Sequence, residues 1–249
     1  MKKYNVITTT DLGTFIINKN DIGVGWQLSE FGTYDPNEIS LMRQVMHFLR
    51  TKKENLIALD VGANIGIHSV ILSSEVGGGR VYSFEAQRII FNMLCGNIAI
   101  NSLENVLCYH NAVSDVNELI NIPQFNYGMP MSFGSVEFAG VQNEKIGQEP
   151  RYDLSEKVST IVLDDVSFQQ VDFMKIDVEG MEHKVLKGSD ALIKKFKPII
   201  FLEYLKSDSN DLIEHLVSNK YNIYSGIGAN FLCFPENFAM RFDGLEKIA

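Results

Sequence analysis

Cysteine and histidine are scarce in this sequence, and neither is arranged for cross-linking or metal binding. Only three cysteines occur among 249 residues. Cys95, Cys108 and Cys233 fall within predicted helix and strand bodies without close spacing, so we expect reduced thiols in the core. The five histidines show no metal-binding spacing. These absences argue against a disulfide scaffold and against a histidine-based zinc site.

Long apolar runs and positive charge are also scarce. No apolar run reaches transmembrane length and no signal peptide precedes Tyr4, so we expect a soluble, cytoplasmic protein with no membrane partner. The formal net charge of −9 disfavours a polyanionic partner. The lysines gathered between Lys184 and Lys197 are expected to form a solvated helix face. We therefore expect a small-molecule or glycan partner and no nucleic acid, while a monomer and a homo-oligomer both stay open.

The segment from Leu56 to Val76 predicts a strand, a tight loop and a helix in succession. An apolar run ends at Asp60, a glycine-punctuated turn follows, and an amphipathic stretch begins after it. Such a unit places a loop backbone and a helix N-terminus against a nucleotide-like ligand. Gly62 and Gly66 suit a backbone that needs unusual dihedrals or a close approach to a ligand.

The spacing of this loop argues against a dinucleotide. A dinucleotide fingerprint reads G-x-G-x-x-G, but Asn64 and Ile67 stand where its second and third glycines would be. We expect Asp60 to face the ligand space, where a carboxylate repels phosphate and attracts ammonium. The combination looks like the D-x-G-x-x-x-G signature of class I S-adenosylmethionine-dependent methyltransferases, whose cofactor is cationic and carries no phosphate. For the glycine motif alone, an ordinary strand–helix turn remains an alternative.

The next two predicted strands also end in polar residues. Arg80 to Glu85 reads as a second strand, and an acid in that position binds a ribose diol through two acceptor oxygens. Asn105 to His110 reads as a third strand, leading into Asn111 and Ala112. In class I methyltransferases this corner holds the adenine, and the Asn111 amide oxygen could accept from the adenine amino group. An asparagine that satisfies a turn is the alternative.

Two more strands end in acids further along the chain. Val171 to Ile176 leads into Asp177 and Glu179, and Pro198 to Glu203 forms another strand with a terminal acid. Ligands of open α/β sheets bind beyond the carboxyl ends of the strands. The repeated strand-end acids therefore predict a ligand site at one edge of a sheet.

These blocks, in their order and spacing, resemble the FkbM family of methyltransferases over most of the chain, from about Trp26 to about Glu203. The most specific block is Lys175 to Gly180. The others are Gly32–Glu38, Asp60–Gly66, Asn111–Asp115, Thr160–Asp165 and Pro198–Glu203. The resemblance implies a Rossmann-like enzyme that uses S-adenosylmethionine, usually on a hydroxyl oxygen. The residues that it implies for cofactor binding are Glu38, Asp60, Gly62, Ala63, Asn64, Gly66, Glu85, Ala86, Asn111, Ala112 and Asp177.

The expected fold is α/β, with a seven-stranded, mostly parallel sheet in the order 3-2-1-4-5-7-6 and helices on both faces. A terminal hairpin of Tyr221–Tyr224 and Phe231–Phe234, around the Gly226–Gly228 turn, would complete the sheet. This core is expected over residues 53–249. It contains an insert at about 114–157 that reads equally well as a lid or binding loop and as an extra hairpin.

Residues 1–52 are expected to form an N-terminal cap beside the core. Tyr4 to Thr9 and Thr14 to Asn18 predict a hairpin. A helix should then begin with Asp35 as its N-cap, Pro36 in the first position and Glu38 in the capping-box position.

Methylation of a hydroxyl calls for a nearby base. Asp177 and Glu179 are the leading candidates, because the end of the fourth core strand abuts the methyl group in this fold. His183 is a secondary candidate, since its ordinary pKa suits a base, although a surface histidine is the simpler interpretation. Asp177, Glu179 and Glu203 could instead hold magnesium. The residue pattern of catechol-type methyltransferases is not matched, so we expect no metal.

Other chemistries find less support in the sequence. No cysteine follows a proline, and no Asn-Pro-Pro-Tyr-like motif occurs, so the motifs of cytosine-carbon and amine methylation are missing. A nicotinamide-dependent oxidoreductase would share the loop and the ribose acid, but the missing glycines count against it. A non-catalytic scaffold that binds S-adenosylmethionine also stays open, because a fold does not establish chemistry.

Overall fold

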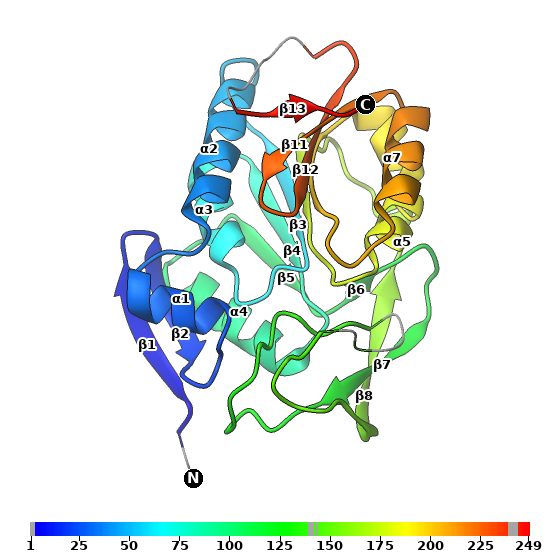
Figure 1. Ribbon diagram of the computed structural model, residues 1–249. Helices are drawn as coiled ribbons and strands as arrows, with labels where there is room; N and C mark the ends of the chain where they lie inside the picture. The colour runs from blue at the N-terminus through cyan, green and yellow to red at the C-terminus, as the bar shows by residue number, and fades with distance from the viewer. Residues whose placement is uncertain (1–2, 139–141, 143, 239–243) are drawn as a thin grey trace.

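An eight-stranded sheet forms the centre of the molecule in the computed structural model, which describes residues 3–138, 142, 144–238 and 244–249 (Figure 1). Each strand of the sheet except the last, which has two residues, is largely apolar, as expected of a sheet covered on both faces. The strands are β3 (Ile57–Val61), β4 (Arg80–Phe84), β5 (Val106–Tyr109), β9 (Phe173–Ile176), β10 (Ile199–Glu203), β11 (Tyr221–Ile227), β12 (Asn230–Pro235) and β13 (Glu246–Lys247).

The strand order across the sheet is β13-β11-β12-β10-β9-β3-β4-β5. Neighbours from β10 to β5 are parallel, and the pairs that join β10, β12, β11 and β13 are antiparallel. The predicted number of seven strands was wrong, because β13 pairs with β11, placing Lys247 opposite Tyr224. The other seven strands, numbered in chain order, run 3-2-1-4-5-7-6, so the whole sheet differs from the predicted order by the added edge strand.

Helices cover both faces of the sheet because alternate strand residues point to opposite sides. Within β10, Ile199 and Phe201 join one apolar cluster, whereas Ile200 and Leu202 join the other. One face carries α2 (Pro36–Arg50), α3 (Ile67–Glu75) and α4 (Arg88–Ile100), and the other carries α5 (Glu182–Lys187), α6 (Asp190–Phe196) and α7 (Ser209–Ser218). Within the described part of the chain, none of the helices has the length and apolar character needed to cross a membrane.

The N-terminal segment packs against the first of these faces. The predicted hairpin is formed by β1 (Asn5–Thr10) and β2 (Gly13–Asn18), which make a separate two-stranded sheet beside α4 (Figure 1). A helix that the sequence analysis did not predict, α1 (Val24–Phe31), follows the hairpin. Phe15, Ile17 and Leu28 are buried in the same apolar cluster as α2 and α3, so this segment shares its core with the sheet.

The start of α2 differs from the predicted capping box. Pro36 does occupy the first turn, but Asp35 adopts a left-handed backbone with φ 34° and its side chain accepts no capping hydrogen bond. Glu38 lies close to His68 on α3, at 3.2 Å, and accepts from Asn230, at 3.3 Å. Asp35 is the N-cap residue, as predicted, but the capping-box contacts are absent because Glu38 is drawn into these buried contacts instead of reaching back to the helix end.

The insert contains a hairpin and a long covering segment. Its strands, β6 (Ala112–Val113), β7 (Leu119–Gln124) and β8 (Arg151–Ile161), form a three-stranded sheet in the order β6-β8-β7. Beyond the insert, β8 continues to Ile161 in this sheet, and Leu163 starts a short 3-10 helix. Between β7 and β8, Tyr127 and Phe133 stack at 4.9 Å and are buried in the main core.

The terminal hairpin turns later than the sequence suggested. The strand β11 continues through Gly226 to Ile227, and Ile227 pairs with Asn230 across the turn. The predicted Gly226–Gly228 turn is therefore shifted to Gly228 and Ala229. This shift brings the turn over the edge where β9 and β10 end, because β12 runs beside β10.

Candidate active site

A cavity of about 250 Å³ lies beyond the carboxyl ends of the parallel strands. Ligands of open α/β sheets bind at this edge. The strand ends and the loop after β3 form its floor, the insert covers it, and residues from α1 and the segment before α2 close one side. The lining residues are Gly23, Val24, Gln27, Tyr34, Gly62, Asn64, Phe84, Glu85, Ala86, Gln87, Asn111, Ala112, Val113, Ser132, Gly134, Ser135, Val136, Phe138, Asp177, Val178, Glu179, Met181 and Glu203.

The loop between β3 and α3 depends on its two glycines. Gly62 and Gly66 have φ angles of 83° and 92°, a region that L residues rarely adopt. A Cβ on Gly62 would lie 1.7 Å from the carbonyl oxygen of Asp177, and one on Gly66 would lie 2.5 Å from Leu94. The expected unusual dihedrals are therefore present, and other parts of the chain come close to both glycines.

Glu85 is fixed at the floor of the cavity by backbone amides. Its Oε2 accepts from the N–H of Asn64 at 2.9 Å, and its Oε1 accepts from the N–H of Gln87 at 2.7 Å. The residue is only 7% exposed, and burial raises the pKa of the carboxyl to about 7 although both amides lower it. Each carboxylate oxygen has a second lone pair, so Glu85 can still accept from a ligand hydroxyl.

The predicted adenine corner lies at one end of the same cavity. Asn111 and Ala112 both line it, and the Asn111 side-chain nitrogen donates to the carbonyl of Ser159 in β8 at 3.1 Å. Apolar side chains from the sheet and the insert surround this end, among them Phe84, Val113 and Phe138. A slot with apolar walls and a few placed polar groups suits a flat heterocycle.

Four predicted cofactor-binding residues, Glu38, Asp60, Ala63 and Gly66, do not line this cavity. Asp60 is fully buried, and its Oδ2 accepts from the Ser69 hydroxyl at 2.5 Å, which lies 2.7 Å from the Ser83 hydroxyl. The expectation that Asp60 faces the ligand space was therefore wrong, because its side chain points into contacts beneath the loop. Ala63 and Gly66 also lie outside the lining, and the Ala63 N–H instead donates to the carbonyl of Phe84 at 2.8 Å.

Three carboxyl groups gather at the opposite end of the cavity. Oxygen atoms of Asp177, Glu179 and Glu203 lie within 4.8 Å of one another. The Lys175 ammonium donates to Asp177 Oδ2 at 2.9 Å, and Lys206 pairs with Glu179. Lys175 is 2% exposed; burial alone would lower the pKa of its amine, but Asp177 and Glu38 raise it, so the ammonium stays charged.

Burial and neighbouring negative charges raise the pKa of two of these carboxyl groups. Burial, and then the charge of Asp177, raise the pKa of Glu179 to about 8. Burial, followed by the charges of Asp177 and Glu179, raises the pKa of Glu203 to about 9. The Oε2 of Glu203 is buried and has no hydrogen-bond partner among the described residues. At neutral pH Glu203 is therefore mostly protonated, whereas Asp177 is paired with a fixed cation.

His183 lies away from these groups, so its predicted role as a base was wrong. It sits on α5 outside the lining of the cavity. Its ring faces that of His215 at 6.0 Å, and its Nδ1 lies 3.9 Å from Asp211 on α7. The helical turn that follows Glu179 directs the side chain into the contact between α5 and α7.

A second cavity of about 240 Å³ adjoins the first, and Tyr34, Asp177 and Glu203 line both. Its other walls come from the start of α2 and from the turn between β11 and β12. Glu38 lines only this second cavity and is 8% exposed. The structure thus separates Glu38 from the predicted ribose and adenine residues.

The sequence analysis missed several residues that line the first cavity or contact its lining. Gln87 is 5% exposed, and its Nε2 donates to the carbonyl of Phe133 at 2.7 Å, which ties the insert to the strand end. Lys206 joins Glu179 to Glu144 of the insert at 3.2 Å. Tyr34 lies within the Gly32–Glu38 block and could have been inferred from it. Gln87 and Lys206 carry no local motif that would have revealed them.

The fold and the site together define a class of protein. An open α/β sheet with a glycine loop after one central strand and a buried acid after the next is a Rossmann-like fold built for a nucleoside-containing ligand. The family profile described as "Methyltransferase FkbM domain" matches residues 60–223. The chain therefore belongs to the FkbM methyltransferase family, which confirms the resemblance found in the sequence.

Two relatives illustrate this membership. The chain is 25% identical over 158 residues to methyltransferase sdnD of Sordaria araneosa, across 55% of this chain and 61% of that protein. It thus spans less than two thirds of that relative's length. The crystal structure of a methyltransferase FkbM from Methylobacillus flagellatus KT matches with a TM-score of 0.52 and 19% identity, over 73% of this chain and 44% of the other. The second likeness concerns the fold alone.

Proposed function

We propose that this chain transfers a methyl group from S-adenosylmethionine to a hydroxyl oxygen of a small molecule, sugar or glycan. The observation that carries the proposal is a single cavity with two chemically different ends. A buried acid held by backbone amides, Glu85, lies toward one end. The carboxyl cluster of Asp177, Glu179 and Glu203 lies at the other. Membership of the FkbM methyltransferase family supports the same reaction class.

The residues of the first cavity fit this cofactor. Glu85 would accept from the ribose hydroxyls, and Asn111 with Ala112 would hold the adenine. Asp177 would face the methionine ammonium from beside Gly62. None of the 23 described lining residues is basic, so the walls suit a cation and offer no cationic side chain to a pyrophosphate. The same observation counts against a nicotinamide dinucleotide.

When bound, S-adenosylmethionine supplies a methyl group on a cationic sulfur. The acceptor oxygen bonds the methyl carbon as the carbon–sulfur bond breaks, which releases the neutral thioether S-adenosylhomocysteine. The protein must place the acceptor hydroxyl and remove its proton. Glu179 is the proposed base, because a pKa of about 8 lies near the operating pH, where a general base is most effective. Asp177, held by Lys175, would orient the acceptor hydroxyl. Protonated Glu203 can donate to a second acceptor oxygen.

We expect the reaction to proceed without a metal ion. The spacing of the three carboxyl groups would permit one, and hard oxygen ligands suit magnesium. The ammonium groups of Lys175 and Lys206 already contact Asp177 and Glu179, however, and so neutralise much of the charge that a metal would need. Treatment with EDTA should leave the transfer rate unchanged, and restoration of a lost rate by Mg²⁺ would contradict this expectation.

The transfer can be tested with S-adenosylmethionine carrying a ¹³C-labelled methyl and a panel of sugars and hydroxylated small molecules. The ¹³C chemical shift of the product separates methyl on oxygen from methyl on nitrogen, carbon or sulfur. We expect an O-methyl product, slowed about 100-fold or more by Glu179→Gln and unchanged by Asp11→Asn, which lies at the exposed tip of the N-terminal hairpin. Methyl on another element would contradict the proposal, and cofactor binding without transfer would favour a scaffold.

A further inference from the structure

We propose that the second cavity binds the acceptor. It selects hydroxyl compounds that are neutral or carry an amine, and it rejects those with a phosphate or carboxylate beside the reacting hydroxyl. This inference rests on the proposed methyl transfer. It adds the location of the acceptor and its charge, which nothing in the family membership assigns. The second cavity is almost as large as the first, at about 240 Å³ against 250 Å³.

The position of the second cavity links it to the reacting end of the first. Glu85 and Asn111 line only the first cavity, whereas Tyr34, Asp177 and Glu203 line both. A ligand in the second cavity therefore meets Asp177 and Glu203, whereas Glu179 and the proposed ribose and adenine residues line only the first cavity. A cofactor in the first cavity and an acceptor in the second would therefore meet at the residues that the two cavities share. This arrangement would bring their reacting atoms together, as methyl transfer requires.

The charges of the second cavity specify what it can bind. Its eleven described lining residues include Asp35, Glu38, Asp177 and Glu203, and none of the eleven is basic. The Lys175 ammonium is already paired with Asp177 at 2.9 Å, and Glu38 lies 3.2 Å from His68. A phosphate entering here would lose water without gaining a cationic partner, and like charges would oppose it. Hydroxyl and ammonium groups would instead donate to the carboxylates.

One feature of the wall favours anions, but the protein already neutralises it. The N-terminus of α2 opens onto the second cavity, and free amides at a helix start attract negative charge. Pro36 occupies the first turn and lacks an N–H, while Asp35 and Glu38 place two carboxyl groups at the same helix end. Asp35 accepts no capping hydrogen bond, so these two carboxyl groups oppose an anionic ligand through their charge alone.

The cavity also offers unused hydrogen-bonding capacity. The buried Oε2 of Glu203 has no partner among the described residues. Asn230, the partner of Glu203 across β10 and β12, donates to Glu38 at 3.3 Å. A polyhydroxylated ligand such as a sugar ring has enough donors to satisfy several of these oxygens at once.

The charge preference is tested with matched acceptors. Monosaccharides, their amino derivatives and their phosphate esters, each set sharing one ring, are incubated with the protein and S-adenosylmethionine carrying a radiolabelled methyl. We expect label in neutral or amino members, and at least about tenfold less in the phosphate ester of the same ring. Equal or preferential labelling of the phosphate esters would overturn the proposal.

The location is tested by filling the second cavity. Ala229→Phe adds a ring at the turn that lines only this cavity, and Ser167→Phe adds the same ring on an exposed loop outside both. Calorimetry with S-adenosylhomocysteine gives a readout that needs no acceptor. We expect Ala229→Phe to keep the cofactor Kd within about twofold and to lower acceptor labelling about 50-fold or more, while Ser167→Phe changes neither.

Each other outcome contradicts a different claim. If Ala229→Phe weakens S-adenosylhomocysteine about tenfold or more, the second cavity holds the methionine end of the cofactor and the acceptor proposal fails. If Ala229→Phe retains full labelling of the acceptor, the acceptor lies elsewhere. If the wild-type protein binds S-adenosylhomocysteine but labels no hydroxyl compound, the proposed function itself fails, independently of the cavity.

Discussion

At the scale of single residues, we expect the proton affinities of the carboxyl cluster to govern the proposed methyl transfer. Glu179 and Glu203 have pKa values of about 8 and 9, because burial and the neighbouring Asp177 oppose their ionisation. Lys206 acts against this trend at Glu179 and lowers its pKa. The cluster therefore supplies one group that titrates near neutral pH and one that stays protonated there.

We predict that kcat/KM for methyl transfer rises with pH through about 8. Glu179 works as a base only when ionised, and its raised pKa keeps it protonated below that value, so activity is lost as the pH falls. Lys206→Met should move this limb to higher pH, because it removes a cation that stabilises the carboxylate. Lys206→Arg retains the charge and should move it back. A rate that is constant between about pH 6 and 9 would contradict Glu179 as the base.

The sequence located some site residues and misplaced others for identifiable reasons. Glu85, Asn111, Asp177 and Glu179 follow strand ends and do line the cavity, although their roles stay predictions. Asp60 also comes at the end of an apolar run, but β3 continues past it to Val61, which is still paired with both neighbouring strands. Its side chain consequently points to the buried Ser69 rather than to the cavity.

At the scale of elements, the loop between β3 and α3 is constrained by the segment that follows β9. We predict that Gly62→Ala destabilises the fold by about 3–5 kcal/mol, because its Cβ would lie 1.7 Å from the Asp177 carbonyl at a φ of 83°. Gly32→Ala is the matched control, since Gly32 has a φ of 67° but no atom within 4 Å of the added Cβ. It should cost only about 1 kcal/mol. Urea unfolding measures both, and equal losses would show that the close contact is not limiting.

A second prediction concerns the contact between the N-terminal hairpin and the sheet. Asn97 on α4 is fully buried. It accepts from the Ile16 N–H at 2.6 Å and donates to the carbonyl of Ile65 in the β3–α3 loop at 2.7 Å. Asn97→Ala would leave these backbone groups without partners and should lower the free energy of unfolding by about 2–4 kcal/mol.

The exposed Asn117 provides the comparison for Asn97. It also makes side-chain hydrogen bonds, to Asp165 and to the Val162 amide, but water can replace them. Asn117→Ala should therefore cost less than about 1 kcal/mol in the same urea titration. A similar loss in both variants would mean that Asn97 does not anchor the hairpin.

The elements that the sequence predicted are those with a strong local pattern. The strands before Asp60, Glu85, Asp177 and Glu203 are apolar runs with polar ends, and the structure has strands there. The helix α1 was missed because it has a glycine inside it and no side-chain cap. The strand β13 was missed because its two residues, Glu246 and Lys247, are exposed and pair only through the tertiary fold.

At the scale of the whole molecule, net charge limits the partners. With a formal net charge of −9, the protein should repel polyanions unless a local basic surface outweighs that field. We predict no shift of a single- or double-stranded RNA probe in a gel-mobility assay at about physiological salt. A salt-dependent shift at low micromolar protein would show that the lysines between Lys184 and Lys197 form a binding surface instead of a solvated face.

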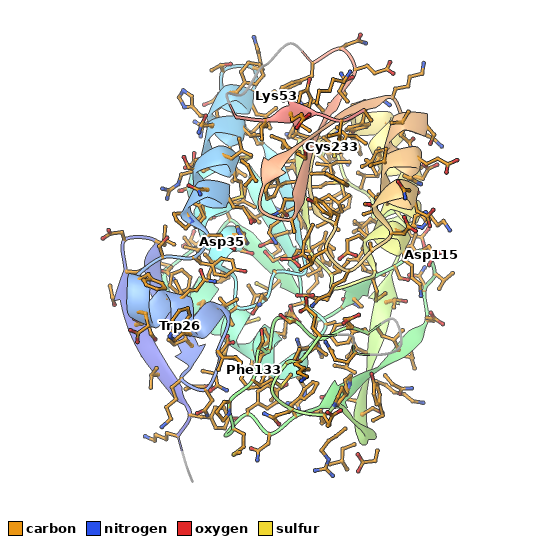
Figure 2. All side chains as sticks on the ribbon, in the orientation of Figure 1. Trp26, Asp35, Lys53, Asp115, Phe133 and Cys233 are labelled. Carbon is orange, nitrogen blue, oxygen red and sulfur yellow. The ribbon has the colours of Figure 1, made fainter. Side chains whose placement is uncertain are left out.

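The arrangement of distant segments could not have been predicted from the sequence alone. Figure 2 shows Asp35 at the start of α2 and Phe133 in the insert, each on a segment that contributes to the cavities. Nearly one hundred positions separate these residues, and no local pattern connects them. Their placement follows from how the N-terminal cap and the insert bury their apolar side chains in one shared core.

The most direct test of the central claim is calorimetric titration of the protein with S-adenosylhomocysteine, with NADH as the competing ligand. We predict binding with a Kd on the order of micromolar, weakened about tenfold or more by Glu85→Ala, because the proposed ribose acceptor is removed. Glu104→Ala, an exposed change outside the first cavity, should bind as the wild type does. Binding of NADH without binding of S-adenosylhomocysteine would contradict the account.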